Sequence, residues 1–228
     1  MIDSPEHHEA PTTLLVLGGT GRTGRHFVRL ALGAGHRVRV VARASSTALE
    51  PHPRLEIRHG SISDPDLALD PLLDGVDAVV SMLGDARAQR TAQVNTALVR
   101  RLIPAMRRSG ANRFLYQAGA LSAPPDRRLP LPLRAVRASV ARAYIGQHED
   151  NEAVMRHLAH EAPDVDWVVH RAAIGSDGPS QGLLQRSRRR SSIATFTDCA
   201  EYSLRLLFDP TAIHTSDLSG YQRSARDR

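Results

Sequence analysis

Hydrophobic residues in this chain form short runs that are separated by glycines and by longer amphipathic segments. The first run, residues 13–17, is continuous and ends at two glycines, as expected of a parallel strand that is buried on both faces. The segment after the glycines, residues 25–32, places its apolar residues at helical spacing and ends at Gly33. The start of the chain therefore predicts a strand, a glycine-rich loop and a helix.

The same alternation continues along most of the chain. We expect further strands at 37–43, 55–60, 78–83, 113–117, 166–171 and 192–196. We expect further helices at 66–73 after Asp64-Pro65, at 92–108, at 135–160 with a break near Gly146, and at 198–208 with Asp198 as N-cap. Strands that alternate with helices through short connections predict right-handed crossovers and a parallel sheet covered on both faces. The expected fold class is α/β, a Rossmann-type doubly wound sheet, in one domain at 12–222 after a disordered N-terminus at 1–11.

Composition excludes several classes of protein. The 228 residues contain no apolar run of about 18 and begin with a polar segment, so we expect neither a membrane span nor an export signal. Cys199 is the only cysteine, which excludes an intramolecular disulfide and a cysteine-based zinc cluster and fits a reducing compartment. We expect a cytoplasmic protein in which Cys199 is packed as a small hydrophobic residue. The eleven histidines form no recognisable ligand set, so no metal is expected.

The basic residues exclude one class of mechanism. All 30 of them are arginines, so no mechanism that needs a lysine ammonium is open to this chain. The formal net charge is +6, but the arginines are scattered apart from a cluster at 186–190, so nucleic-acid binding is disfavoured. That cluster is most simply interpreted as a solvated hairpin or loop.

The loop after the first strand has the spacing GxxGxxG. A glycine-rich turn at this point lets the backbone approach a pyrophosphate, whose charge is met by free N–H groups at the helix N-terminus. A tight connection without a ligand is the alternative. The residues expected to bind the dinucleotide here are Gly18, Gly19, Thr20, Gly21, Arg22, Thr23 and Gly24.

Cofactor preference is determined at the end of the second strand, where Arg43 stands. A carboxylate at this position would bind the ribose hydroxyls, whereas an arginine accepts a 2′-phosphate, so NADP(H) is favoured. Arg22 is expected to be a second phosphate contact that faces the adenosine ribose. Both arginines could instead be ordinary surface residues. Further cofactor contacts are expected at the carboxyl ends of the third and fourth strands, at Ser61, Ile62, Met82, Leu83 and Gly84.

With these residues in place, the chain resembles the atypical short-chain dehydrogenase/reductase family, in the NAD(P)H-binding group that includes NmrA-like proteins. The resemblance covers roughly residues 12–210, and the segments that carry it are 17–24, 35–43, 75–81, 112–116 and 167–171. Within the group, the segment 174–179 and the short C-terminal region look most like flavin reductase, also called biliverdin-IXβ reductase.

The sequence departs from that family at its catalytic residues. The family's better-known enzymes use a serine after the fifth strand and a Tyr-x-x-x-Lys pair, in which the lysine lowers the tyrosine pKa. Here residues 117–120 contain no serine, Ser122 comes late, and Tyr144 is followed four residues later by His148. Tyr144 and His148 could share a helical face, with an imidazolium partly replacing the ammonium. A packed tyrosine and a surface histidine are the alternative.

The resemblance implies NADPH-dependent hydride transfer to a small planar acceptor such as a flavin or a quinone. Such an acceptor is already electrophilic and solvent can supply the proton, so positioning the two rings suffices. On this interpretation Gly119 and Ala120 border the nicotinamide, and His170, Arg171 and Ile174 border the substrate. Arg171 could equally form a buried structural ion pair. The alternative function is a non-catalytic NADP(H) sensor of the NmrA-like type, and the expected state is a monomer or homodimer.

Overall fold

The computed structural model describes residues 11–43, 46, 49–139, 141–188 and 190–222. The N-terminal segment expected to be disordered lies, except for Pro11, outside the described residues. The strands are β1 (Thr13–Leu17), β2 (Arg37–Ala42), β3 (Leu55–His59), β4 (Ala78–Ser81), β5 (Arg113–Gly119), β6 (Asp166–Ser176), β7 (Leu184–Ser187), β8 (Ile193–Thr195) and β9 (Thr215–Tyr221). The α-helices are α1 (Arg22–Gly33), α2 (Asp70–Leu73), α3 (Val94–Ser109), α4 (Leu131–Ala138), α5 (Ile145–Glu161) and α6 (Phe196–Phe208). Short 3₁₀ turns are η1 (Ala88–Arg90), η2 (Arg142–Tyr144) and η3 (Pro210–Ala212).

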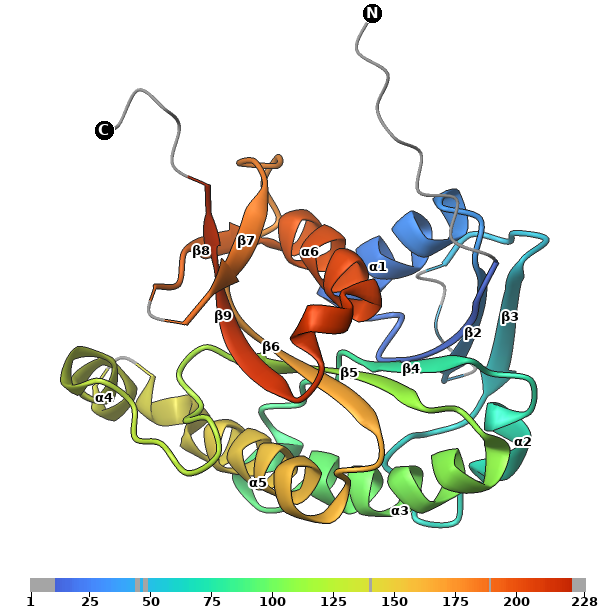
Figure 1. Cartoon of the computed structure of the whole chain (residues 1–228), viewed down its shortest axis with the longest axis horizontal. Helices are drawn as coiled ribbons and strands as arrows, with labels where there is room; N and C mark the ends of the chain where they lie inside the picture. Colours follow the sequence, from blue (N-terminus) through green and yellow to red (C-terminus); the bar gives the residue numbers. More distant parts are fainter. Residues whose placement is uncertain (1–10, 44–45, 47–48, 140, 189, 223–228) are drawn as a thin grey trace, which may run out of the picture.

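The strands form one sheet in the order β3-β2-β1-β4-β5-β6-β9-β7, with β8 paired to the end of β6 (Figure 1). All pairings in the described chain are parallel except that of β7 with β9. The chain winds outward from β1 in both directions, which confirms the predicted doubly wound α/β fold.

Helices cover both faces of the sheet: α1 and α6 on one side, α2, α3 and α5 on the other (Figure 1). The alternation within β1 explains why a continuous apolar run is needed there. Leu14 and Val16 belong to the core that packs on α1 and α6, and Leu15 and Leu17 belong to the core that packs on α3 and α5. All four side chains are fully buried, because a central parallel strand has no solvent face.

The helix predicted at 66–73 is reduced to the single turn α2. The carboxylate of Asp64 accepts a hydrogen bond of 2.9 Å from the backbone N–H of Asp66, and Leu67 N–H bonds back to the carbonyl of Asp64. This local bonding satisfies the backbone in a turn, so the Asp64-Pro65 signal marks a turn and the helix begins later.

The long helix predicted at 135–160 is divided into α4, η2 and α5. The hydroxyl of Ser139 donates to the carbonyl of Ala135 at 2.8 Å, at the end of α4. The break therefore precedes Gly146, which lies in the first turn of α5. A Cβ on Gly146 would lie 2.1 Å from the carbonyl oxygen of Gln89, so this glycine is required by a close approach of η1.

The C-terminal third contains one wrong prediction and two strands that the sequence did not predict. The N-cap of α6 is Thr195, whose hydroxyl accepts from the backbone N–H of Asp198 at 3.1 Å. Asp198 instead lies in the first turn of the helix, where its carboxylate accepts from Gln181 N–H and from the Tyr221 hydroxyl. The unpredicted strands are β7 and β9, which carry few apolar residues.

Candidate functional site

The loop between β1 and α1 is shaped by glycines. Gly18 has φ +82°, and a Cβ on it would lie 2.8 Å from the carbonyl oxygen of Met82. A Cβ on Gly24 would lie 2.0 Å from the carbonyl oxygen of Gly18, so only glycine lets α1 start this close to the strand. Gly21 is the N-cap of α1, and no side chain in the described chain caps it. The N–H groups of the first turn are therefore available to an anion.

A cavity of about 270 Å³ lies beside this loop, at the carboxyl ends of β1 to β4. Parallel strands place their carboxyl ends at one edge of the sheet, so residues that are far apart in the sequence meet here. Nine of the residues predicted to bind the cofactor line it: Gly18, Thr20, Gly21, Arg43, Ser61, Ile62, Met82, Leu83 and Gly84.

The other loop residues lie outside the lining of this cavity. Gly19, Thr23 and Gly24 are largely or fully buried where α1 packs on the sheet. The guanidinium of Arg22 stacks over the Phe196 ring, 5.2 Å from its centroid. The Arg22 side chain therefore lies against the first residue of α6, and the structure does not place it beside Arg43, on the side expected for the adenosine ribose.

The end of β2 presents a cation to the cavity. Arg43 is exposed and shares the lining with Ser61 and Ser63, which follow β3. The only acidic residue in this lining is Asp85, whose carboxylate accepts the backbone N–H groups of Arg87 and Ala88 at the start of η1. Proteins that prefer unphosphorylated ribose carry a carboxylate at the end of this strand. Here the same place has a positive charge and two neighbouring hydroxyls.

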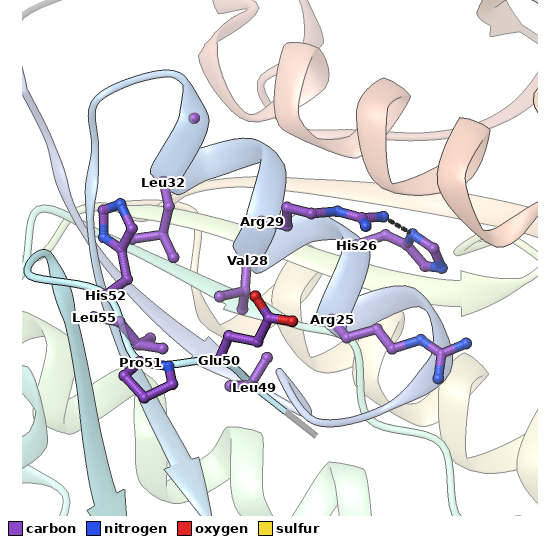
Figure 2. Close-up of a pocket in the computed structure, with 11 residues that line it drawn as sticks. Arg25, His26, Val28, Arg29, Leu32, Leu49, Glu50, Pro51, His52 and Leu55 are labelled. Carbon is purple, nitrogen blue, oxygen red and sulfur yellow. Dashed lines mark hydrogen bonds between the residues drawn. The ribbon is translucent and has the colours of Figure 1, made fainter. Parts of the chain in front are cut away.

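A second cavity, of about 410 Å³, lies on the outer flank of α1 (Figure 2). Its walls are α1 and the segment 49–55, and Figure 2 shows Glu50 and Leu49 facing Val28 across it. On one rim Arg29 contacts the ring of His26 at 2.7 Å. This cavity shares no lining residue with the one at the strand ends, so we do not assign it to the cofactor.

A buried polar cluster joins the end of β5 to α5. The Tyr116 hydroxyl donates to Asn151 Oδ1 at 2.6 Å and accepts from Asn95 Nδ2 at 3.0 Å. Asn151 Nδ2 donates to Ser122 Oγ at 3.2 Å, and Ser122 Oγ lies 3.4 Å from His148 Nδ1. We call these five residues the Ser122–His148 cluster. It brings Ser122, whose position in the sequence is late for the family's serine, beside His148, four residues after Tyr144.

His148 is buried and uncharged. Burial lowers its pKa to about 4, and nearby Arg137 lowers it further while Glu152 opposes the shift. Its Nε2 has no partner in the described chain. The imidazolium suggested from the sequence is therefore wrong near neutral pH, and so is the alternative of a surface histidine. Tyr144 is 49% exposed, and no described hydrogen bond joins it to His148.

Gly119 lies next to this ring, since a Cβ on it would be 3.5 Å from His148 Nδ1. Ala120 continues the strand by donating its N–H to the carbonyl of Ala172 at 2.9 Å. The side chain of Gln147 reaches the backbone of Gly84, the last predicted contact after β4. The ends of β4 and β5 and the start of α5 thus converge on one place, at the edge of the sheet where ligands bind in open α/β folds.

Asp150 is an anchoring residue that sequence reasoning missed. Its fully buried carboxylate accepts the backbone N–H groups of Asn95 and Thr96, each at 2.9 Å, and the Gln89 amide at 2.8 Å. Asp150 thereby caps α3 from α5 and fixes the helix that carries His148. The available signal was a carboxylate in the middle of an otherwise ordinary helix.

His170 does not border a substrate site. It is fully buried, and its ring nitrogens lie 2.9 Å from Ser203 Oγ and 2.8 Å from Ser219 Oγ. Burial lowers its pKa to about 3, so it is a neutral residue that links β6 to α6 and β9.

Arg171 braces the loop after β5. Its Nε donates to the carbonyl of Ser122 at 2.9 Å, and Nη2 donates to the carbonyl of Ala120 at 3.1 Å. Burial lowers its pKa to about 10, which leaves it charged near neutral pH. These contacts are with backbone carbonyls, so the described geometry gives Arg171 a positioning role, and no ion pair of Arg171 is found among the described residues. Its predicted contact with the substrate stays a prediction. Ile174, the third predicted substrate residue, is half-buried and packs against the α1/α6 core.

Cys199 and the described arginines of the cluster at 186–190 lie outside the candidate site. Cys199 is fully buried, and burial raises its pKa to about 12, as expected of a packed thiol. Arg186 belongs to β7 and pairs at 3.7 Å with both Asp209 and Asp217, while Arg189 lies outside the described residues.

In the described chain no group of three or more His, Cys, Asp or Glu side chains could hold a metal ion. Nor is any described helix long and apolar enough to span a membrane.

The glycine loop at the head of α1 and the cavity at the strand ends together define a dinucleotide-binding α/β protein. The chain belongs to the NAD(P)H-binding family, whose model matches residues 18–210. The predicted atypical short-chain dehydrogenase/reductase group and the use of a nicotinamide cofactor are thereby confirmed. The closer likeness to flavin reductase stays a prediction.

Curated relatives match about half of this chain. The 3 beta-hydroxysteroid dehydrogenase/Delta 5-->4-isomerase of Mycobacterium tuberculosis is 36% identical over 114 residues, which are 45% of this chain and 30% of that protein. The photosystem II assembly factor Ycf39 of Synechocystis is 34% identical over 107 residues, 45% of this chain and 32% of that protein. The match thus spans about a third of the length of these relatives.

Solved structures share the fold at low sequence identity. The oxidoreductase ylbE of Lactococcus lactis superposes with a TM-score of 0.75 at 15% identity, covering 95% of this chain and 94% of that one. A short-chain dehydrogenase/reductase of Veillonella parvula in complex with NADP has a TM-score of 0.69 at 13% identity, covering 92% and 95%. At these identities the likeness concerns the fold alone.

Proposed function

We propose that this protein is an NADPH-dependent reductase that transfers hydride to a flavin, a quinone or a similar planar acceptor. The observation that carries the proposal is that no charged side chain lies in direct contact with Gly119, at the nicotinamide end, among the described residues. Gly119 there lies against the neutral His148 ring and the Asn151 amide, and the chain has no lysine. Such a site can position rings but offers no strong acid to polarise an ordinary carbonyl, whereas a flavin or quinone accepts hydride without one.

The same geometry supports a preference for NADPH. On this proposal the N–H groups at the start of α1 bind the pyrophosphate, and Arg43 with Ser61 and Ser63 binds the 2′-phosphate. Residues 82–84 and 119–120 border the ribose and the nicotinamide. NADPH supplies the hydride, and the protein's own residues orient it and exclude water from the ring.

Turnover is tested by following NADPH oxidation at 340 nm with FMN, riboflavin and a simple quinone, each corrected for the uncatalysed rate. We expect saturable turnover that Gly21→Trp abolishes, because the new side chain fills the mouth of the loop cavity. Gly33→Ala is the matched control, since a Cβ on Gly33 meets nothing within 4 Å. Tight NADP(H) binding without turnover on any acceptor would refute the reductase and favour the sensor.

A further inference from the structure

A cavity between α4 and α5 carries an excess of positive charge. Its volume is about 470 Å³, and the residues that line it come from the loop after β5, from α4 and from the first half of α5. Four arginines and two glutamates line it, an excess of two positive charges: Arg127, Arg128, Arg134, Arg137, Glu149 and Glu152.

Only part of this charge is neutralised within the protein. Arg137 pairs with Glu152, and both side chains are 19% exposed. Glu152 Oε1, which accepts from Arg137, also accepts the backbone N–H of Ala123 at 2.7 Å, so this carboxylate already has two donors. The guanidinium groups of Arg127, Arg128 and Arg134 contact no acceptor among the described residues. Three free guanidinium groups therefore face a cavity that holds one unengaged carboxylate, Glu149.

The cavity adjoins the nicotinamide end of the candidate site. Ala123 follows Ser122 directly, and Glu152 lies one helical turn beyond His148 on the same face of α5. Arg171 fixes the carbonyl of Ser122, so the loop that separates the two sites is held in place. A molecule whose ring lies against Gly119 could extend its substituent into this cavity.

We propose that the cavity between α4 and α5 binds a phosphate monoester carried by the acceptor, so that the enzyme selects phosphorylated over unphosphorylated flavins. This inference rests on the proposed reductase function. Guanidinium groups bind phosphate oxygens through paired, charge-assisted hydrogen bonds, and a dianionic phosphate matches the excess of two positive charges. No residue of α4 is buried, so this helix forms a wall of the cavity rather than a part of the core.

The test compares kcat/KM for FMN and riboflavin, which share a ring and differ in the phosphate. We expect the wild type to favour FMN by about tenfold, the lower end for one charge-assisted contact. The double variant Arg127→Gln/Arg134→Gln should bring the ratio close to one through a rise in KM for FMN, with riboflavin turnover unchanged. The control Arg100→Gln/Arg142→Gln removes two exposed arginines outside the cavity and should keep the preference.

Equal use of both flavins by the wild type, or a preference that survives in the double variant, would overturn the inference and leave the reductase intact. Inorganic phosphate should inhibit FMN reduction competitively and spare riboflavin. Phosphate binding without any FMN preference would identify a free-anion site and overturn the acceptor assignment. If neither flavin turns over, the proposed function fails. The cavity is then tested separately, by measuring the binding of each flavin through the quenching of its fluorescence. FMN binding that exceeds riboflavin binding and is lost in the double variant supports the cavity, and equal binding refutes it.

Discussion

Replacing Arg43 by Gln removes the only cation that the end of β2 presents to the described cofactor cavity, while leaving the glycine loop untouched. A hydrogen bond to a charged group contributes about 1.5–3 kcal/mol when it is well shielded. Arg43 is exposed, so water and salt reduce this to about 1–2 kcal/mol. At about 1.4 kcal/mol for each factor of ten, NADPH should bind about 5- to 30-fold more weakly.

NADH has no 2′-phosphate, so its affinity should change by less than about twofold in the same variant. Arg43→Asp should shift the preference further, because a carboxylate repels the phosphate and can accept hydrogen bonds from the ribose hydroxyls. The measurement is a titration of each nucleotide by its change in fluorescence, at low and at high salt. The wild-type preference for NADPH should narrow as salt rises, since an exposed pair is screened.

Arg100→Gln is the matched control for charge, because Arg100 is an exposed arginine on α3 outside the cavity. It should leave both affinities unchanged. An equal loss of NADPH and NADH binding in Arg43→Gln would refute the assignment of Arg43 to the 2′-phosphate. The result would then indicate that Arg43 supports the loop or the adenine side without reading the phosphate.

Three further predictions concern Asp150, His148 and Tyr144. Asp150→Asn should lower the free energy of unfolding by about 3 kcal/mol in urea titrations, because an amide NH₂ then faces donors that the carboxylate had satisfied. His148 has a pKa of about 4 in the folded chain against an ordinary value of 6.5, so the unfolded chain binds the extra proton between these pH values. Stability should therefore fall as pH drops from about 6.5 to 4, and His148→Gln should flatten that dependence, whereas an unchanged slope would contradict the burial of the ring. Tyr144→Phe should leave turnover within about twofold of wild type, since Tyr144 is exposed and unbonded to His148; a loss of a hundredfold or more, as expected for a general acid, would contradict this.

The central strands were predictable because their signals are local. β1 and β4 are short, mainly apolar runs that are buried on both faces, β2 ends in the buried apolar run Val40–Ala42, and the glycines after β1 mark the loop by spacing alone. The cavity residues followed from one topological rule, that ligands bind at the carboxyl ends of parallel strands. For the same reason nine of the predicted cofactor contacts came together without any knowledge of side-chain positions.

The errors concern residues whose role depends on distant segments. His170 lies on a predicted strand, but its partners Ser203 and Ser219 come from α6 and from β9, which carries few apolar residues and is defined by its pairing with β6. Ser122 comes later in the chain than the serine of the family's better-known enzymes. A turn in which Ser122 N–H bonds to the carbonyl of Gly119 at 3.0 Å folds it back toward His148. Neither arrangement has a signature in the order of residues.

The lack of lysine agrees with the proposed function, because every basic side chain apart from histidine is then an arginine. An arginine keeps its proton near neutral pH, so it binds phosphate well and serves poorly as an acid or base. On the proposed function, arginines stand where phosphates must be held, Arg43 at the adenosine end and Arg127 with Arg134 beyond the nicotinamide end. The groups between them, Ser122 and His148, are uncharged. Selectivity then resides at the two charged ends, and the reaction between them depends on an acceptor that needs no protonation before it receives hydride.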